Sequence, residues 1–363
     1  MNGDEPLRLD DFAALARRSL PHEVWDFVEG GAGEELTLAA NRAALDRIGL
    51  VPRVLTGAKS DGTGTELLGT WAALPVAVAP MAYQRLVHPE GELATARAAA
   101  TAGIPFTVST LSSEPVEAVT AVGGTTWFQL YCRQDHAATL QLVRRAEEAG
   151  CTALMVTVDV PAMGRRLRDL RNGFALPPEV RAAHFDPDDN QLARDRRPGV
   201  SAVARHTAAS FARTLGWDDL ERLRDTTQLP LIVKGILDPR DASRAASLGA
   251  DAIVVSNHGG RQLDGAPASV DMLPAVRDAV PERCRVLLDS GIRGGTDVLK
   301  ALALGASGVL LGRPVLWGLA ADGEKGVLRV LRLLAAELRC ALELSGCSSA
   351  VDAQELLVRR RVR

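Results

Sequence analysis

The stretch IVVSNHGGRQLD, residues 253–264, decides the fold and the chemistry that this sequence predicts. Its β-branched run at 253–255 is typical of a buried strand, and it ends abruptly in a polar loop that contains two glycines. The loop places His258, which titrates near neutrality, beside the fixed cation of Arg261. This pairing suits an acidic substrate that must lose a proton. The alternative, a strand-capping histidine and a solvated arginine, is disfavoured by matching features elsewhere in the chain.

Seven further apolar runs end in the same way, in polar or glycine-rich residues. Helical patterns separate the runs, and several of them end in a glycine that suits a helix C-cap. Eight strands alternating with helices predict an α/β fold, the (β/α)8 or TIM barrel, whose active site lies at the C-terminal ends of the strands. The predicted strands span residues 75–82, 105–110, 127–131, 153–159, 231–235, 252–258, 285–290 and 308–312.

Polar side chains gather where the predicted strands stop, as an active site at that end of a barrel requires. One of them, Lys234, would be costly to bury alone, so we expect a carboxylate or an anionic ligand beside it. The other polar residues at strand ends are Gln129, Tyr131, Thr157, Asp159, Ser256, His258, Asp289 and Ser290.

The segments outside the strands are predicted to be additions to one barrel domain. Residues 1–70 form an N-terminal helical extension, residues 71–350 the barrel, and residues 351–363 a C-terminal tail. The insertion at 161–216 is long enough to be a lid, although the composition of about 185–205 favours a disordered segment. The arginine-rich end of the tail is most simply solvated or disordered, and a binding role stays open.

Composition argues against several classes of function. Lysine and arginine number 42 and aspartate and glutamate 45, so the net charge of -3 does not favour a nucleic-acid-binding surface. The five cysteines have neither CxxC spacing nor histidines at metal-ligand spacing, so we expect no disulfide framework and no metal site. The N-terminus lacks an apolar signal core, and no apolar run approaches the roughly 18 residues of a membrane span. We therefore expect a soluble, cytoplasmic protein that does not contact the membrane.

Two glycine-rich loops after the last two strands predict a phosphate site. The loops are SGIRGGT at 290–296 and GRP at 312–314. Glycines let backbone N–H groups approach a phosphate, a following helix N-terminus favours negative charge, and Arg293 or Arg313 can bind it. Tight turns are the alternative, but this is the usual phosphate position in barrels. Between this site and His258, the strand ends could hold a phosphorylated substrate or a flat phosphorylated cofactor.

Several motifs together resemble the FMN-dependent α-hydroxy-acid oxidases and dehydrogenases, the family that includes glycolate oxidase. The resemblance covers about residues 8–350, and the motifs occur in the family's order. It implies bound FMN, a small 2-hydroxy acid as substrate and a homotetramer. The motifs are HPEGELATARAA, WFQLY, TVDVPAMGRR, LIVKG, SNHGGRQLDGAPA, DSGIRGGTDVLKALALGA and LGRPVLWGLA.

The resemblance also implies roles for the matched residues. His258 would be the catalytic base, with Asp159 orienting its ring. Arg166 and Arg261 would hold the substrate carboxylate, and Tyr131 would bond to the substrate. Among the cofactor contacts, the lysine would face the N1 and C2-carbonyl edge of the flavin. The implied cofactor contacts are Ala79, Pro80, Met81, Ala82, Ser109, Gln129, Thr157, Lys234, Ser256, Asp289, Gly291, Arg293, Gly312 and Arg313.

Three departures from glycolate oxidases predict a larger substrate pocket. Phe27 stands where those enzymes have tyrosine, Tyr83 where they have methionine, and Leu111 where they have a bulky tryptophan. The stretches APMAYQRL and GRRLRDLRNGFALP, together with Phe27, most resemble the 4-hydroxymandelate oxidases, a group that serves antibiotic biosynthesis. The resemblance thus implies oxidation of an (S)-2-hydroxy acid of the mandelate type, with O2 reduced to H2O2. Ser290 stands where the family usually has glycine, with no predictable effect on the flavin.

Other functions stay open from the sequence. The substrate could instead be lactate or glycolate, or the enzyme a mandelate dehydrogenase with another electron acceptor, although Ala82 and the polar insertion favour an oxidase. The glycine-rich loop also resembles inosine monophosphate dehydrogenases, but the segment after Val255 lacks their nucleophilic cysteine. A non-catalytic flavin-binding protein would have lost the base or the arginines, which are all present.

Overall fold

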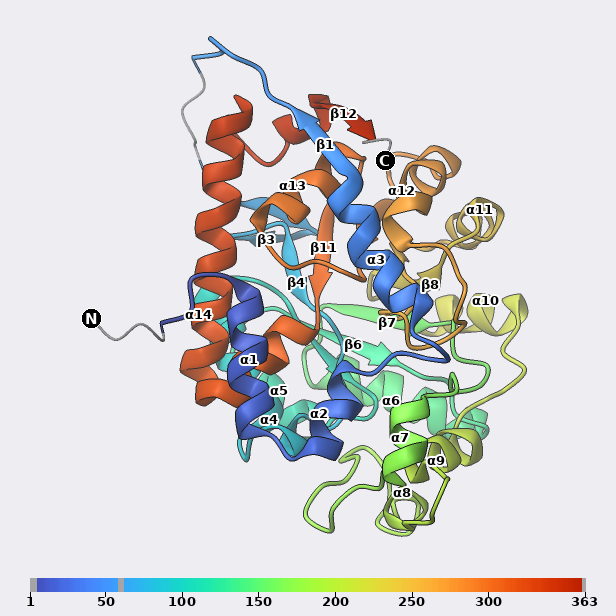
Figure 1. Ribbon diagram of the computed structural model, residues 1–363. Helices are drawn as coiled ribbons and strands as arrows, with labels where there is room; N and C mark the ends of the chain where they lie inside the picture. The colour runs from blue at the N-terminus through green and yellow to red at the C-terminus, as the bar shows by residue number, and fades with distance from the viewer. Residues whose placement is uncertain (1–4, 58–61, 361–363) are drawn as a thin grey trace.

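In the computed structural model, which describes residues 5–57 and 62–360, eight parallel strands close into a barrel (Figure 1). Their order around the barrel is β10-β11-β4-β5-β6-β7-β8-β9, so chain neighbours are also neighbours in space. The predicted TIM barrel is confirmed, and every predicted strand has an observed counterpart. The strands are β4 (Val76–Val78), β5 (Phe106–Ser109), β6 (Thr126–Leu130), β7 (Ala153–Thr157), β8 (Leu231–Ile236), β9 (Ala252–Val255), β10 (Arg285–Leu288) and β11 (Gly308–Leu311).

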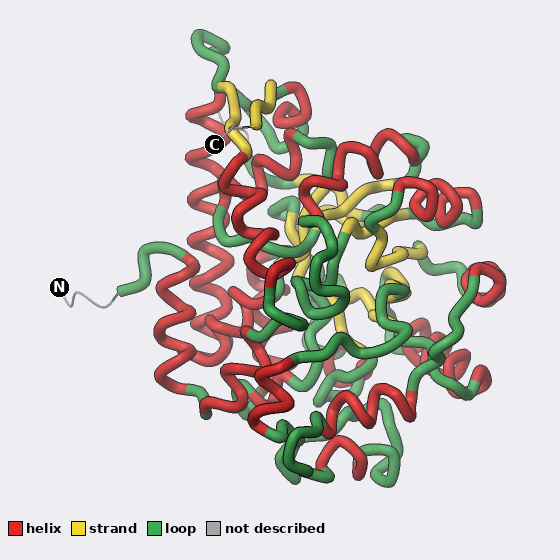
Figure 2. Tube along the Cα trace, turned by 45° about the vertical axis from the view of Figure 1, so that its right-hand side comes forward, coloured by secondary structure: helices red, strands yellow, loops and turns green. Residues whose placement is uncertain are grey.

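Helices surround the strands on the outside (Figure 2). Capping residues set the start of some of them, since Asp135 and Asp238 each accept an N–H from the first helical turn that follows. Among the described residues, none of the helices is both long and apolar enough to cross a membrane. The surrounding helices are α4 (Gly91–Ala102), α5 (Val116–Thr120), α6 (His136–Glu148), α10 (Trp217–Thr226), α11 (Pro239–Ser247), α12 (Ser269–Ala279), α13 (Gly295–Ala303) and α14 (Arg313–Ser345).

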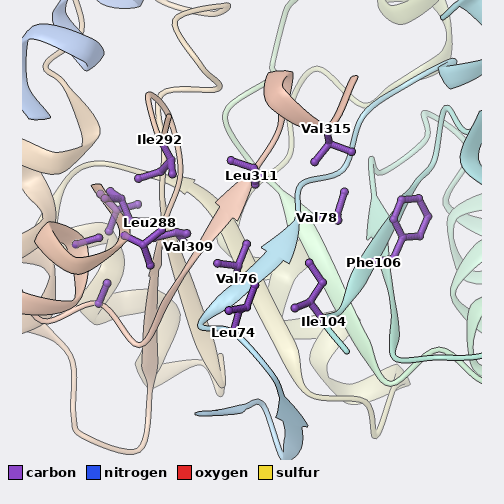
Figure 3. Packing of buried hydrophobic residues seen from close by; sticks show 14 of the residues in the cluster. Leu74, Val76, Val78, Ile104, Phe106, Leu288, Ile292, Val309, Leu311 and Val315 are labelled. Atoms are coloured by element: carbon purple, nitrogen blue, oxygen red, sulfur yellow. The ribbon is translucent and has the colours of Figure 1, made fainter. Parts of the chain in front are cut away.

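Successive side chains along each strand point alternately toward the helices and into the barrel, and this divides the hydrophobic core into two layers. Val76 and Val78 of β4 face the helices, where they pack near Phe106 and Val309 (Figure 3). The intervening residues face inward and fill the barrel, so it is a packed core and not a pore. The inner layer consists of Leu67, Ala72, Ala77, Ala79, Trp127, Ala153, Met155, Ile232, Ala252, Val254, Leu287 and Leu310.

The hairpin of β2 (Thr65–Leu67) and β3 (Thr70–Ala72) contributes two residues to the inner layer. Leu67 lies against the first residue of β11, because a side chain at Gly308 would come within 3.0 Å of it. The hairpin therefore closes the N-terminal end of the barrel, which leaves the C-terminal end for the chemistry.

The described part of the N-terminal extension contains three helices, which agrees with its predicted helical character. Its first helix packs along the long α14 at one side of the barrel, and its second reaches the end toward which the arrow of β11 points (Figure 1). This is the C-terminal end of the strands, so the extension contributes to the active-site side. The helices are α1 (Leu9–Ser19), α2 (His22–Glu29) and α3 (Leu36–Arg47).

The C-terminal residues are more ordered than the composition predicts. After η2 (Asp352–Glu355), β12 (Leu357–Arg360) pairs antiparallel with β1 (Ile48–Val51). For Arg359 and Arg360, the part of the arginine-rich end within this strand, the predicted disorder is wrong, because the backbone pairs with β1, while the Arg359 side chain is exposed to solvent as predicted. Part of the arginine-rich end, residues 361–363, lies outside the described residues.

The insertion after β7 is ordered, which corrects the predicted disorder at about 185–205. Phe185 is buried in a small apolar cluster, and Asn190 bonds through both side-chain atoms to the backbone of Ala182. A few well-placed apolar and polar anchors thus hold a segment whose average composition is polar. Its helices are α7 (Leu167–Asn172), α8 (Gln191–Arg194) and α9 (Ala202–Ser210), near α2 in Figure 1.

Glu92, in α4, is a buried carboxyl group that anchors the segment after β4. Its Oε1 accepts the N–H groups of Gln84 at 3.1 Å and Ser113 at 2.8 Å, while Oε2 has no partner in the described part of the chain. Burial raises the pKa of Glu92 from 4.5 to about 7. The neutral form therefore stabilises the fold fully below pH 4.5, and this stability is lost as the pH rises through about 7.

We expect Glu92→Gln to increase the free energy of unfolding at pH 8 by on the order of 3 kcal/mol, and to change it much less at pH 5. The amide keeps the acceptor oxygen but cannot ionise. Urea unfolding at the two pH values measures the difference. Glu117→Gln, which loses an exposed ion pair with Arg145, should not gain stability at pH 8. An equal effect of Glu92→Gln at both pH values would contradict the buried ionisation.

Candidate active site

A cavity of about 200 Å³ lies where the strands of the barrel end. It brings together residues that are far apart in the chain, from the N-terminal extension, the insertion and the barrel. Most of the site residues predicted from the sequence line it. They are Phe27, Ala79, Pro80, Met81, Ala82, Tyr83, Ser109, Leu111, Tyr131, Arg166, Lys234, His258, Arg261, Asp289, Gly291, Arg293, Gly312 and Arg313.

The other predicted site residues, all within the described chain, lie behind the cavity wall. Gln129 accepts a hydrogen bond from the hydroxyl of Ser109 at 3.1 Å and donates to the hydroxyl of Thr157 at 3.0 Å. Ser256 contacts Lys234, and Asp159 contacts His258. The structure therefore places these residues as supports for side chains that reach the cavity.

His258 and Asp159 form a close pair at the C-terminal ends of β9 and β7, the two strands that flank β8 in the barrel. The Nδ1 atom of His258 lies 3.0 Å and 3.2 Å from the two carboxylate oxygens. Nδ1 therefore carries the proton, and Nε2, which lies 3.5 Å from the hydroxyl of Tyr131, is free to accept one. Burial lowers the pKa of His258, and the attraction of Asp159 offsets this only in part. The imidazole is thus poised as a neutral base.

The carboxylate of Asp159 is held in its charged form. Burial acts to raise its pKa, but the imidazole of His258 and the ammonium of Lys234 outweigh burial, and the pKa is lower than usual. Gly235 gives it room, because a side chain there would come within 2.6 Å of Asp159. With φ at +109°, Gly235 also has a backbone conformation that favours glycine. Asp159 can therefore stabilise an imidazolium on His258.

The backbone that carries His258 is in the left-handed region, with φ of +59° there, +67° at Gly259 and +75° at Gly260. Such a conformation is uncommon for a residue other than glycine and costs about 1–3 kcal/mol. Side-chain oxygens hold it in place: Ser256 accepts the N–H of His258 at 3.0 Å, and Asn257 accepts that of Gly260 at 3.1 Å. The turn therefore presents the imidazole to the cavity in one defined orientation.

Lys234 is buried, and the predicted carboxylate lies beside it. Its Nζ is 3.0 Å from Oδ2 of Asp289 and 3.1 Å from the hydroxyl of Ser256. Burial acts to lower the pKa of Lys234, but Asp289 and Asp159 outweigh burial and raise it. A permanent positive charge therefore faces the cavity.

Four arginines add to this charge, namely Arg166, Arg261, Arg293 and Arg313. Burial lowers the pKa of each, and each is also repelled by another nearby guanidinium. Arginines nevertheless stay charged, so their mutual repulsion favours anions between them. The cluster suits both a phosphate and a carboxylate, which is the donor set that FMN and an acidic substrate require.

Two of the arginines connect the N-terminal extension to the barrel. Arg261 donates to the carbonyl of Gly30 at 2.7 Å and to that of Val28 at 3.3 Å. Arg313 donates to the same two carbonyls, at 3.2 Å and 3.1 Å. Cations are favoured at the C-terminal end of a helix, here α2. This contact holds Phe27 at the edge of the cavity.

Arg166 differs from these two, since its Nε is buried without a hydrogen-bond partner among the described residues. Asp169, which the sequence did not single out, lies close enough to attract it but does not bond to it through either oxygen within the described chain. Burial raises the pKa of Asp169, although Arg166 and Arg261 oppose this. Arg166 therefore retains donors that an anion can use.

The side of the cavity formed by the extension and the insertion is apolar. Phe27 stacks on Phe174 with ring centroids 4.6 Å apart, and Tyr131 packs on Phe211 at 4.9 Å. The hydroxyl of Tyr83 is buried with no partner among the described residues. This side therefore offers room for an aromatic ring near His258.

Sequence reasoning missed the part of this side that comes from the insertion. Met163, Val203, Thr207 and Phe211 all line the cavity. A signal existed, because Val203 and Thr207 are four residues apart and share one face of α9, and Phe211 follows at the C-terminal end of this helix. The composition of the segment is polar on average, and this concealed the spacing.

Comparison with known proteins agrees with this geometry. Residues 16–360 match the family model described as FMN-dependent dehydrogenase. The chain is 56% identical over 348 residues to a 4-hydroxymandelate oxidase of Amycolatopsis orientalis, with 96% of this chain and 97% of the relative covered. It is 49% identical to an L-lactate oxidase of Nostoc sp., with 96% of each covered. A crystal structure of mandelate oxidase with (S)-4-hydroxymandelic acid has a TM-score of 0.96 at 54% identity, with 99% of this chain and 100% of that chain covered.

Proposed function

Since the chain belongs to the FMN-dependent dehydrogenase family, we propose that it oxidises an aromatic (S)-2-hydroxy acid to the 2-oxo acid. The substrate is 4-hydroxymandelate or mandelate, the product is 4-hydroxyphenylglyoxylate or benzoylformate, and O2 is reduced to H2O2. Two electrons and two protons leave the substrate, and O2 takes up the same number. The oxidase assignment is supported by similarity to a 4-hydroxymandelate oxidase and an L-lactate oxidase.

One observation carries the choice of an aromatic substrate. A single cavity combines the His258 and Asp159 pair with an apolar side formed by Phe27, Tyr83 and Leu111. A ring placed there would lie beside the base, which suits a substrate whose reacting carbon is attached directly to the ring.

Substrate binding is assigned to the two arginines. Arg166 and Arg261 would hold the carboxylate, each through charge-assisted hydrogen bonds. Tyr131, whose hydroxyl is 3.5 Å from Nε2 of His258, would bond to the substrate hydroxyl or carboxylate. This arrangement fixes the α-carbon next to the base, and orientation of this kind is a large part of catalysis.

Proton transfer is assigned to Nε2 of His258. The nitrogen would take a proton from the α-carbon or from the hydroxyl, and the geometry is compatible with either order of events. Asp159 would stabilise the imidazolium through its contact with Nδ1. The carboxylate itself keeps its negative charge, because its pKa is already below the usual range.

The residues at the barrel mouth fit FMN. Arg293 and Arg313, with the glycines of their loops, would hold the phosphate, and Asp289 the ribityl chain. Lys234 would face the edge of the flavin ring that becomes negative. When bound, FMN accepts the two electrons of the substrate and transfers them to O2.

The test is an anaerobic absorbance measurement with 4-hydroxymandelate, mandelate, lactate and glycolate in separate samples. We expect the aromatic acids to bleach the flavin band fastest, and air to restore it. A tryptophan at Leu111 would occupy the ring space, so Leu111→Trp should slow bleaching by the aromatic acids at least about tenfold and spare glycolate.

Two outcomes would contradict the proposal in different ways. Bleaching by lactate or glycolate alone would refute the aromatic substrate. A bleached band that air does not restore would indicate a dehydrogenase with another acceptor. The homotetramer and the cytoplasmic location stay predictions, and light scattering of the purified protein tests the first.

A further inference from the structure

The hydroxyl of Ser290 connects two parts of the site that the proposed mechanism uses separately. Its Oγ accepts the N–H of Gly259 at 3.0 Å, directly after His258 in the chain. The same hydroxyl donates to Oδ1 of Asp289 at 2.6 Å. The other oxygen of Asp289 lies 3.0 Å from Nζ of Lys234. One side chain therefore joins the turn of the base to the charged pair at the barrel mouth.

These contacts form a closed ring. From Lys234, the ring returns to the base through Ser256, whose Oγ accepts both the Nζ hydrogen and the N–H of His258. The backbone from His258 to Gly259 then leads to Ser290 and Asp289. Within this ring, a shift of the base would have to move the lysine or break a hydrogen bond. Connected hydrogen bonds of this kind support one another in a low-dielectric site.

The backbone at Ser290 indicates that the side chain is there for its hydroxyl. Its φ is +75°, a conformation that costs a residue with a Cβ roughly 1–2 kcal/mol and that glycine adopts freely. The side chain is also buried, with an exposed fraction of 8%. Two hydrogen bonds at this position offset the strain, since each contributes on the order of 1 kcal/mol.

Three consecutive backbone N–H groups of the turn each donate to a side-chain oxygen. These acceptors come from different parts of the chain. The acceptors for His258 and Gly260, Ser256 and Asn257, belong to the turn itself. The acceptor for Gly259 comes from the next strand of the barrel, after β10. Ser290 is thus the member of this set that fixes the turn to the rest of the barrel mouth.

We propose that Ser290 is a positioning residue for the oxidation, which holds His258 at its working distance from the substrate and holds Asp289 on Lys234. This inference rests on the proposed function, because the base acts only if a 2-hydroxy acid is oxidised. Ser290 acts through the backbone of Gly259 and through Asp289. Within the described part of the chain it makes no hydrogen bond to Arg166 or Arg261, so substrate affinity should not depend on it.

The first test compares Ser290→Ala with the wild type. Alanine keeps the Cβ and the left-handed backbone but loses both hydrogen bonds. We expect the rate constant of anaerobic flavin reduction by 4-hydroxymandelate to fall about tenfold, because small misplacements of a catalytic group cost this much or more. The dissociation constant of the substrate should stay within about twofold, because the carboxylate contacts are untouched. Ser290→Gly also lacks the hydroxyl but relieves the backbone strain. An equal fall in its rate constant of flavin reduction therefore excludes misfolding as the cause.

The second test does not depend on flavin or on turnover. In the protein without FMN, the amide of Gly259 should exchange its hydrogen faster in Ser290→Ala than in the wild type, because it has lost its acceptor. Hydrogen exchange followed by NMR or by fragmentation mass spectrometry resolves this amide. This readout tests the contact itself.

Ser269→Ala is the matched control, since it removes another buried hydroxyl that donates to Asp289, at its backbone carbonyl. It should leave the reduction rate and the Gly259 exchange unchanged. Reduction of Ser290→Ala at the wild-type rate, or an equal loss in Ser269→Ala, would overturn the positioning role. If no 2-hydroxy acid reduces the flavin of the wild type, it is the proposed function that is wrong. The hydrogen-exchange measurement still shows whether Ser290 bonds to the amide of Gly259.

Discussion

His258→Ala is expected to retain FMN but to be reduced by 4-hydroxymandelate roughly 10⁴-fold more slowly than the wild type. The change removes Nε2, the one ring nitrogen left free by the contact between Nδ1 and Asp159. It leaves Arg166 and Arg261 in place to bind the substrate carboxylate. Stopped-flow absorbance under anaerobic conditions measures the rate of reduction. The flavin spectrum of the purified variant shows whether FMN is retained.

The control for this variant is His22→Ala, since His22 is exposed and does not line the cavity, with its Nε2 3.2 Å from a carboxylate oxygen of Asp26. It should be reduced at the wild-type rate. Asp159→Asn should also slow reduction, because the amide cannot stabilise an imidazolium as a carboxylate does. Near-normal reduction of His258→Ala would refute its role as the base and leave the FMN assignment standing.

Arg166→Met is expected to lower kcat/KM for 4-hydroxymandelate by about 10²–10³-fold, which corresponds to the loss of a buried charge pair with the substrate. The Nε of Arg166 has no partner among the described residues, so its donors are available to the carboxylate. Arg261, in contrast, already donates to backbone carbonyls of α2. We therefore expect Arg166 to contribute more of the carboxylate binding than Arg261 does.

A neutral substrate separates charge recognition from general damage to the site. The amide of mandelate lacks the carboxylate, so Arg166→Met should lower its oxidation by less than about tenfold. Arg165→Met makes the same change at the neighbouring, exposed position and should leave both substrates unaffected. Equal losses for the acid and the amide would contradict the role of Arg166 in holding the carboxylate.

The barrel and the polar half of the site could be predicted because they depend on local patterns. Each strand is a short apolar run, and its C-terminal end is marked by a change to polar residues, as at Lys234 and His258. A parallel barrel then brings all such ends together, whatever their separation in the chain. The buried lysine even indicated its own partner, which the structure identifies as Asp289.

The part of the apolar side that the insertion contributes depends on tertiary packing, which the average composition of a segment does not specify. The insertion is polar on average, yet Phe185 and Asn190 fix it in place. The left-handed backbone at Ser290 is likewise invisible in the sequence, because serine is seldom found there. Sequence reasoning noticed that this serine was unusual but could not assign it a role without the two hydrogen bonds.

The contact between α2 and the arginines of the barrel has a consequence during synthesis. The carbonyl of Val28 leaves the ribosome early, but its partner Arg313 follows 285 residues later. At a translation rate of about 5–20 residues per second, Arg313 is synthesised on the order of tens of seconds after α2. The hydrogen bonds of Arg313 that help to hold Phe27 at the cavity cannot form before then. The apolar side of the cavity is therefore among the last parts of the nascent chain to form, after nearly the whole barrel has been synthesised.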